Sequence, residues 1–550
     1  MSKQRINQEA RKKRINCREA LDIETNPKAR SKREIENQEK LTDRRERRKH
    51  AKEIREKVKQ SRKELVERKK AEGILLPPQS GVSNAKSPYK TIEDQQAAHE
   101  EVVAAQFSTY LAMLPPLLIK FSKIPDPRNP GKVKHKVTVL IIYGIVMFLF
   151  NIKSLRDANQ VMSGATFFEN LKMLIPEFET MPHSGTLSRL LEKIDVTEIE
   201  SAHIDLIRKL IRKKKFCRYL ISKCYPIAID GTQKLVRKGD NWPEEWLERV
   251  FKTKDGEEIQ RYIYVLEANL VFFNGMSLPL LTEFLSYSDD GADDNKQDCE
   301  LKAFHRLAEK LHDYFPRLPI MVLLDGLYPT GPLMQSIQDY RWQYMIVLPS
   351  KCLTKTWHAA KARQELGITG ELTGNKNHVW NGRRQHFQWS NNISYFFGDN
   401  KTELKVNLVT CEEEYLELDD KSGEIVVKKA FHAWLSSSPL NSDNVHERCN
   451  LGARYRWAIE NSFQTEKCGG YKYSHMFSNN WNATKGFHYI MRLAHLLNDI
   501  AIHTKRVAEL VHKKGVRAFL ASVREICAAP WLRPERIKEL LSHPFQFQFL

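Results

Sequence analysis

PIMVLLDG, residues 319–326, is an apolar run that ends in an aspartate and a glycine, and PIAIDG, residues 226–231, repeats the pattern. A short apolar run bounded by turn residues is typical of a fully buried strand. A carboxylate at the end of such a strand projects from the sheet edge, where ligands bind in open α/β sheets. The pattern predicts that Asp230 and Asp325 lie at one edge of a sheet. The alternative for each aspartate is a helix N-cap after a strand.

The sequence around these two runs predicts the order strand, strand, strand, helix, strand, helix, strand. Residues 262–273 and 278–285 are apolar runs separated by a turn with a glycine, which indicates a hairpin. Residues 297–313 and 331–340 have helical spacing, and residues 344–348 are a further apolar run. A mixed α/β core is therefore expected.

The flanking segments differ from this core in composition. Helical spacing is expected over residues 93–220, with a break at Pro115-Pro116, and it resumes over residues 446–470 and 482–512. Apolar and polar residues alternate over residues 351–440, which predicts a β-rich insertion. We expect a basic arm and linker, disordered or helical, over residues 1–92 and a helical DNA-binding region over residues 93–220. The core is expected in two parts, residues 221–350 and 441–510, on either side of the insertion at residues 351–440. Residues 511–550 are expected to form a C-terminal helical region.

The net charge of the chain points to an acidic partner. Lys and Arg number 88 against 68 Asp and Glu, a net of +20. Residues 1–75 hold 26 Lys and Arg and 14 Asp and Glu, so +12 of the excess lies in the arm. Such an excess is most often matched by nucleic acid. The alternative is a solvated basic tail without a specific partner.

The cysteines and the apolar segments indicate where in the cell such a protein is expected to act. Nine cysteines are scattered along the chain and never form a C-x-x-C pair, which argues against a zinc site and a disulfide framework and favours a reducing compartment. The charged start of the sequence does not resemble a signal peptide. The longest apolar run, residues 137–150, is too short to span a bilayer and predicts a buried helix.

A third acid lies in RWAIENSFQTEK, residues 456–467. Arg456, Glu460 and Lys467 are four and seven residues apart, so they share one face of a helix. An ordinary helix with i,i+4 ion pairs gives the same spacing. Glu466 is a second acid in this segment, but it lacks that spacing to the two cations.

These motifs together resemble the bacterial insertion-sequence transposases of the DDE type. The similarity is to the large group whose third acidic motif reads Tyr, two residues, Arg, three residues, Glu, six residues, Lys. The chain supplies Arg456, Glu460 and Lys467 at that spacing, but Ala453 stands where tyrosine is expected and Tyr455 follows two residues later. Similarity extends through the two strand-Asp-Gly motifs and covers roughly residues 120–505.

The resemblance implies an RNase H-like mixed sheet with flanking helices, interrupted by the insertion. It implies that Asp230, Asp325 and Glu460 are the catalytic residues and hold two divalent ions, Mg²⁺ or Mn²⁺. One ion activates water or a 3′-hydroxyl, and the other stabilises the leaving oxygen of an in-line phosphoryl transfer. Oxygen ligands alone also favour Mg²⁺ or Mn²⁺. Arg456, Lys467 and the nearby Tyr455 are expected to bind phosphates of double-stranded DNA.

Other implications concern bases and partners. Some relatives flip a base onto a tryptophan, and Trp457 and Trp434 are candidates for that stacking, although a buried core position is the preferred interpretation of each. The expected partners are terminal inverted repeats and target DNA, with a homodimer on paired ends in a bacterial cytoplasm and no membrane. Two alternatives remain open: a transposase-derived DNA-binding protein that no longer cuts, and a nuclease without end specificity.

Overall fold

The computed structural model describes residues 27–71, 89–239, 241–253, 256–285, 299–419, 422 and 424–550. The chain divides into two compact units, which we describe separately. The smaller unit comprises Met1–Pro77, Asn377–Gln385 and Glu412–Ala430. The larger unit comprises the remaining residues and contains every residue of the candidate site.

The smaller unit contains a long helix, α2 (Pro27–Ala71), and the outer ends of strands of the insertion. Lys57 of α2 forms an ion pair with Glu424, with 2.8 Å between Nζ and Oε1. The helical alternative for the basic arm is therefore observed over Pro27–Ala71, and the rest of residues 1–88 lies outside the described part.

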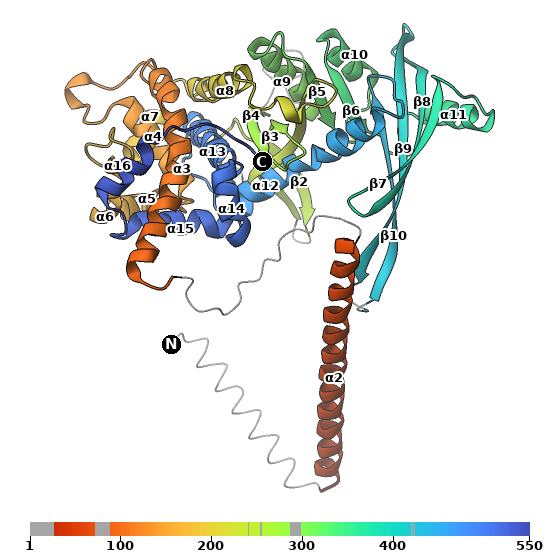
Figure 1. Cartoon of the computed structure of the whole chain (residues 1–550), viewed down its shortest axis with the longest axis horizontal. Helices are drawn as coiled ribbons and strands as arrows, with labels where there is room; N and C mark the ends of the chain where they lie inside the picture. The colour runs from red at the N-terminus through yellow and green to blue at the C-terminus, as the bar shows by residue number, and fades with distance from the viewer. Residues whose placement is uncertain are drawn as a thin grey trace. The chain divides into compact units, whose positions relative to one another are not determined.

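A ten-stranded mixed sheet forms the centre of the fold (Figure 1). Its strand order is β2-β3-β1-β5-β6-β10-β9-β8-β7, and β4 pairs with β3 off this path. β1 runs antiparallel to β3 and parallel to β5, which is parallel to β6. The strands have the following bounds: β1 Tyr225–Lys238, β2 Leu247–Thr253, β3 Gly256–Val271, β4 Ser277–Phe284, β5 Ile320–Leu324, β6 Gln343–Val347, β7 Thr373–Trp380, β8 Arg383–Phe397, β9 Thr402–Asp419 and β10 Glu424–Ser436.

The mixed α/β class predicted from the sequence is confirmed, with differences in detail. β2 and a helix within the predicted β-rich insertion, α11 (Thr354–Glu365), were not predicted. The insertion also extends the central sheet, because its last strand, β10, pairs antiparallel with β6. The core helices α9 (Glu300–Tyr314) and α10 (Gly331–Asp339) lie where the spacing placed them.

Most other helices of the larger unit form a helical region, drawn from orange to yellow and in blue in Figure 1. Its central helix is α13, which is buried along most of its length and packs against α4, α3, α8 and α7. The bounds are α3 Ile92–Phe121, α4 Val137–Leu149, α5 Leu155–Met162, α6 Ala165–Leu174, α7 Ser184–Leu191, α8 Thr197–Arg212, α13 Trp481–Ile502, α14 Lys505–Lys514, α15 Val516–Ala528 and α16 Pro534–Ser542.

Two helix predictions in this region were wrong. α3 continues through Pro115-Pro116, because Met113, Leu117 and Phe121 are buried on both sides of the prolines and hold the helix in place. The helix predicted over residues 482–512 divides between α13 and α14, where Thr504 Oγ1 donates a hydrogen bond to the carbonyl of Ala501.

Among the described residues, α3 is the helix whose length and apolar composition would allow it to cross a membrane. Half of its apolar stretch is buried within the protein, and its fully buried Glu100 forms an ion pair with Arg533 (2.6 Å from Oε2 to Nη2). This packing is that of a core helix, which passes the same test of length and composition.

Candidate functional site

The two predicted aspartates lie on neighbouring parallel strands. Ala228 of β1 is paired with Leu323 of β5, and the same register places Asp230 beside Asp325. In adjacent parallel strands, residues at the same level point to the same face of the sheet. Both carboxylates therefore belong to one face, at the level where β5 ends at Leu324.

The prediction that Asp230 ends its strand was wrong. β1 continues to Lys238, because residues beyond Asp230 remain paired with β3 on the other side of the strand. Asp230 lies opposite Glu267 of β3 and is held within the sheet. On its other side β1 is paired with β5, which is shorter and ends at Leu324. Asp230 therefore lies at the edge of the sheet that the end of β5 creates.

Asp325 does follow the last residue of its strand. Its Oδ1 accepts a hydrogen bond from the backbone N–H of Leu327 at 2.9 Å, which closes a turn of the Asx type. The next residue must be small, because a Cβ on Gly326 would lie 2.5 Å from Cγ of Pro349. Asp325 therefore caps a tight turn through one of its two carboxylate oxygens.

Glu460 reaches the same place from α12 (Trp457–Cys468). The Arg456 guanidinium lies between two of the acids: Nη1 is 3.3 Å from Asp230 Oδ2 and Nη2 is 2.7 Å from Glu460 Oε1. The arginine side chain is only 7% exposed, whereas that of Glu460 is 37% exposed. The structure thus brings Asp230, Asp325, Glu460 and Arg456 together from β1, β5, α12 and the turn before α12.

The pKa of the Asp230 carboxyl reflects its burial and the other charged groups around it. Burial raises the pKa of Asp230 to about 6; Arg456 opposes that rise, and the nearby anions Asp325 and Glu460 add to it. Neighbouring carboxylates repel one another, and a cation placed among them relieves that repulsion. The arrangement carries a surplus of negative charge that one arginine does not balance.

Lys467 lies further along the same helix. Its Nζ donates a hydrogen bond to Thr232 Oγ1 at 2.6 Å, two residues after Asp230 on β1. The ammonium group also lies 5.7 Å from the centre of the Tyr473 ring. Arg456, Glu460 and Lys467 therefore share the face of α12 that is turned towards β1, as their spacing predicts.

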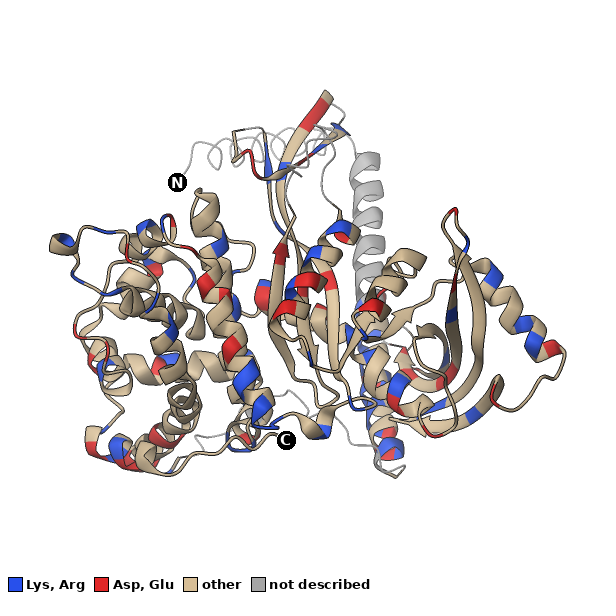
Figure 2. Ribbon diagram, turned by 90° about the horizontal axis from the view of Figure 1, so that it is seen from above, with Lys and Arg blue, Asp and Glu red and all other residues tan. Residues whose placement is uncertain are grey.

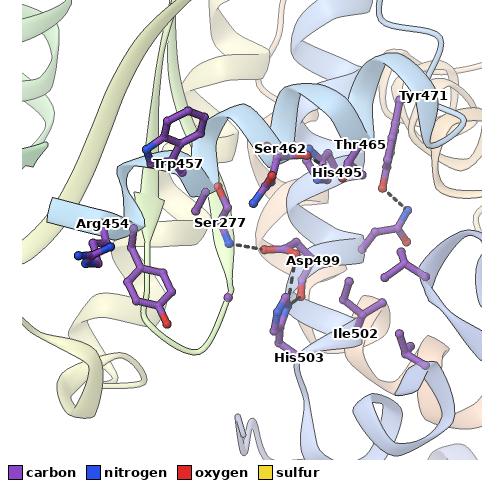
Figure 3. Close-up of a pocket in the computed structure, with 17 residues that line it drawn as sticks. Ser277, Arg454, Trp457, Ser462, Thr465, Tyr471, His495, Asp499, Ile502 and His503 are labelled. Atoms are coloured by element: carbon purple, nitrogen blue, oxygen red, sulfur yellow. Dashed lines mark hydrogen bonds and ion pairs between the residues drawn. The ribbon is translucent and has the colours of Figure 1, made fainter. Parts of the chain in front are cut away.

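The opposite face of α12 lines a cavity of about 470 Å³ (Figure 3). Trp457 and Tyr455 line this cavity. The preferred core interpretation of Trp457 was wrong: its side chain is 61% exposed, because the first turn of α12 turns it away from the sheet, and the Arg456 guanidinium lies 5.2 Å from the centre of its ring. Tyr455 is half-buried, and burial raises its pKa.

Trp434 is a core residue, as the preferred interpretation has it. It is 3% exposed on β10, where it pairs with Val347 of β6. The ring of His432 stacks on it at 5.5 Å, and the guanidinium of Arg454 lies 5.6 Å from its ring centre. Its indole therefore contacts both of these neighbours.

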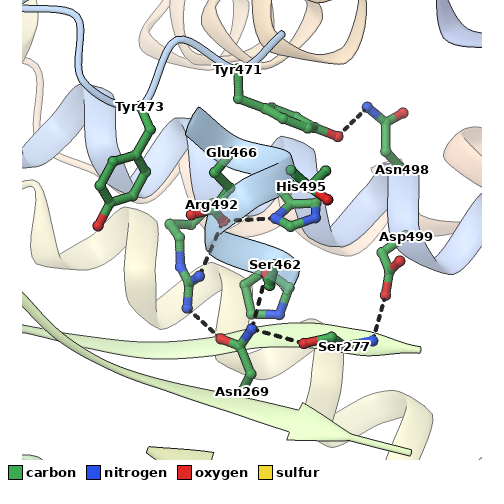
Figure 4. Close-up of polar contacts among 12 residues, drawn as sticks. Asn269, Ser277, Ser462, Glu466, Tyr471, Tyr473, Arg492, His495, Asn498 and Asp499 are labelled. Atoms are coloured by element: carbon green, nitrogen blue, oxygen red, sulfur yellow. Dashed lines mark hydrogen bonds and ion pairs between the residues drawn. The ribbon is translucent and has the colours of Figure 1, made fainter. Parts of the chain in front are cut away.

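Glu466, the second acid of the segment, belongs to a buried ion network beneath α12 (Figure 4). Its Oε1 is 3.1 Å from Arg492 Nη1 and 2.7 Å from His495 Nδ1. Arg492 also forms an ion pair with Glu267 and donates to Asn269 Oδ1 at 2.8 Å. Burial alone would raise the pKa of Glu466, but Arg492 and His495 outweigh burial and hold the pKa well below its usual range.

This network ties α12 to β3, the strand that pairs with β1 beside Asp230. Asn269 of β3 donates to Ser462 of α12 at 3.1 Å and to Ser277 at the start of β4 at 3.0 Å. Glu267, which pairs with Arg492, lies directly opposite Asp230 in the sheet. The sequence does not reveal this network, because Arg492 and His495 occur within an otherwise apolar helix.

A fourth carboxylate, which the sequence patterns did not single out, lies beside Asp230. Glu300, the first residue of α9, accepts hydrogen bonds from the hydroxyls of Tyr264 and Tyr328, the latter at 3.1 Å. A Cβ on Gly231 would lie 2.5 Å from Glu300 Oε1, so Glu300 supports β1 beside Asp230. Burial and the anions Glu300, Asp325 and Asp230 all raise the pKa values of both tyrosines.

The charge of the described residues does not by itself single out a DNA-binding face. Lys and Arg are spread over the helices and strands and are interspersed with Asp and Glu (Figure 2). The candidate site is therefore defined by the convergence of particular side chains.

Residues 118–207 match the family model described as DDE_Tnp_1-associated. The matched stretch runs from the end of α3 through α8, in the helical region that precedes β1. This match supports a DDE-type transposase family for the chain. No curated protein matches the chain.

Proposed function

We propose that this chain is a DDE transposase that cuts and joins the DNA of an insertion sequence by two-metal phosphoryl transfer. The observation that carries the proposal is the convergence of Asp230, Asp325 and Glu460 from three separate segments. The match over residues 118–207 supports the same class of enzyme.

An RNase H-like core is part of this proposal. The supporting observation is the strand order β4-β3-β1-β5-β6 within the sheet. On one side of β1 each strand is antiparallel to its neighbour, and on its other side β5 and β6 are parallel to it. Asp230 lies on β1, and Asp325 directly follows the adjacent strand β5. The Glu460 helix packs across β1 and β3 and completes the set of acids.

The donor chemistry of the site fits divalent ions, because three carboxylates share one place and their charge is only partly balanced. Among the described residues, however, no three Asp, Glu, His or Cys side chains converge closely enough to hold a metal as they stand. The Arg456 guanidinium occupies the space between Asp230 and Glu460. Asp230, Asp325 and Glu460 would hold Mg²⁺ or Mn²⁺ once that side chain moves aside.

When bound, the two ions supply an activated water or 3′-hydroxyl and stabilise the leaving oxygen. The protein's own contribution is positioning. β1 and β5 fix the two aspartates at one level, and the buried network beneath α12 fixes the helix that carries Glu460. Lys467, beside Thr232, and Arg456 offer cations to DNA phosphates at the edge of the site.

The partners follow from this chemistry. The substrate is double-stranded DNA that carries the terminal inverted repeats of the element, and the product strand is joined to target DNA. We propose that two copies of the chain act on paired ends. Phosphate contacts make binding strongly dependent on salt concentration.

The direct test is an assay of end cleavage with the purified full-length chain. The substrates are a duplex bearing the inverted repeat that flanks the gene and a scrambled duplex of equal length and composition. We expect nicking at the repeat terminus in Mg²⁺ or Mn²⁺, no nicking in EDTA, and little nicking of the scrambled duplex.

The other outcomes separate the alternative functions. Tight binding to the repeat without nicking in either metal would support a transposase-derived DNA-binding protein; Ala453, which is 4% exposed, stands where the related motif has its tyrosine. Equal nicking of both duplexes would support a nuclease without end specificity. Either result would overturn the proposal.

A further inference from the structure

Arg456 stands between the two acids that a shared metal ion would have to bridge. One guanidinium nitrogen is 3.3 Å from Asp230 Oδ2, and another is 2.7 Å from Glu460 Oε1. Mg²⁺ holds its oxygen ligands at about 2.1 Å, so an ion shared by these carboxylates needs them closer together than a guanidinium allows. The arginine and the ion therefore exclude each other from this place.

The arginine is held in this position only incompletely. Its Nε is buried and has no hydrogen-bond partner in the described structure. Its pairing with Glu460 is an i,i+4 pair on one helical segment, a class that contributes little to stability. Its contact with Asp230, at 3.3 Å, is longer than a strong charged hydrogen bond.

A DNA phosphate is a better partner for such a group. The guanidinium presents a planar fork of donors that matches phosphate oxygens, and the unused Nε belongs to that fork. Lys467 lies on the same face of α12, where it offers a second cation to the DNA backbone. When Arg456 moves to the phosphate, Asp230 and Glu460 lose their only shared counter-charge among the described residues.

We propose that Arg456 is a latch that couples metal binding to DNA binding. In the DNA-free chain it closes the metal site by bridging Asp230 and Glu460, and a DNA phosphate draws it away and opens the site. The inference rests on the proposed function. Its consequence is that a chain without DNA does not hold ions ready to hydrolyse chance substrates. Because linkage is reciprocal, the metal also strengthens DNA binding.

The test is the affinity of the whole chain for Mn²⁺, measured by calorimetry with and without a duplex that bears the inverted repeat. The readout is metal binding, and cleavage is not measured. We expect Arg456→Gln to bind Mn²⁺ roughly tenfold more tightly than the wild type when DNA is absent. We expect DNA to tighten Mn²⁺ binding by the wild type to a similar degree. DNA should have little effect on Mn²⁺ binding by Arg456→Gln.

The matched control is Arg454→Gln, which removes an arginine two residues away that lies against Trp434, apart from the acids. It should bind Mn²⁺ as the wild type does. The comparison of the wild type with and without DNA needs no variant, so the inference stays testable if Arg456→Gln fails to fold.

Two negative results have different meanings. Equal Mn²⁺ affinity of the wild type with and without DNA would overturn the latch while leaving the metal-dependent function in place. No Mn²⁺ binding by the wild type even with DNA would overturn the proposed function, and the latch with it.

Discussion

Replacing Asp230 by Asn should lower the rate of end cleavage by on the order of 10³-fold or more. The variant keeps the size and position of the side chain, which is 17% exposed on a strand paired on both sides. It removes a charge from a site whose chemistry requires three carboxylates. Binding of the repeat duplex should persist, because the cations Arg456 and Lys467 remain.

The measurement is single-turnover nicking with Mg²⁺, alongside binding of the same duplex. Asp339→Asn, at the exposed end of α10, is a matched control that should cleave at the wild-type rate. If Asp230→Asn cleaves within about tenfold of the wild type, Asp230 does not carry the chemistry.

Replacing Arg492 by Met should destabilise the fold by about 3–5 kcal/mol, because Glu267 and Glu466 are then left buried without their shared cation. Both acids are fully buried; His488 and His495 remain as their partners, together with the Tyr473 hydroxyl, which donates to Glu267 Oε1 at 2.8 Å. Burial lowers the pKa of His488 to about 4, so that histidine does not supply a replacement charge near neutral pH.

Urea unfolding followed by circular dichroism measures this loss. Arg517→Met, at an exposed position of α15, should change stability by no more than about 0.5 kcal/mol. Adding Glu466→Gln to Arg492→Met should recover part of the loss, since it removes one of the uncompensated charges. A variant Arg492→Met as stable as the wild type would mean that the network does not hold α12 in place.

The sequence was sufficient to predict the parts of the site that depend on local pattern. Apolar runs that end in Asp-Gly identify β1 and β5, because a buried parallel strand is apolar on both faces. The spacing of Arg456, Glu460 and Lys467 fixes their common helical face, whatever the helix packs against. These two rules place the three acids and both cations on their elements, whereas the choice of Glu460 as the third acid came from the resemblance to the insertion-sequence transposases.

The features that were missed depend on partners far away in the chain. The length of β1 beyond Asp230 is set by its pairing with β3, which local composition does not reveal. The exposure of Trp457 depends on the cavity behind α12, and an aromatic residue at a helix start is equally compatible with a core. Arg492 carries no recognisable motif, because its meaning comes from Glu267 and Glu466 on other elements.

The most direct measurement of the central claim is anomalous diffraction from crystals of the chain bound to a repeat duplex in Mn²⁺. Two peaks, roughly 3.5–4 Å apart, should lie among the carboxylates of Asp230, Asp325 and Glu460, with the Arg456 guanidinium turned towards a phosphate. Manganese bound elsewhere, with those three carboxylates still joined through Arg456 in a complex that cleaves DNA, would contradict it.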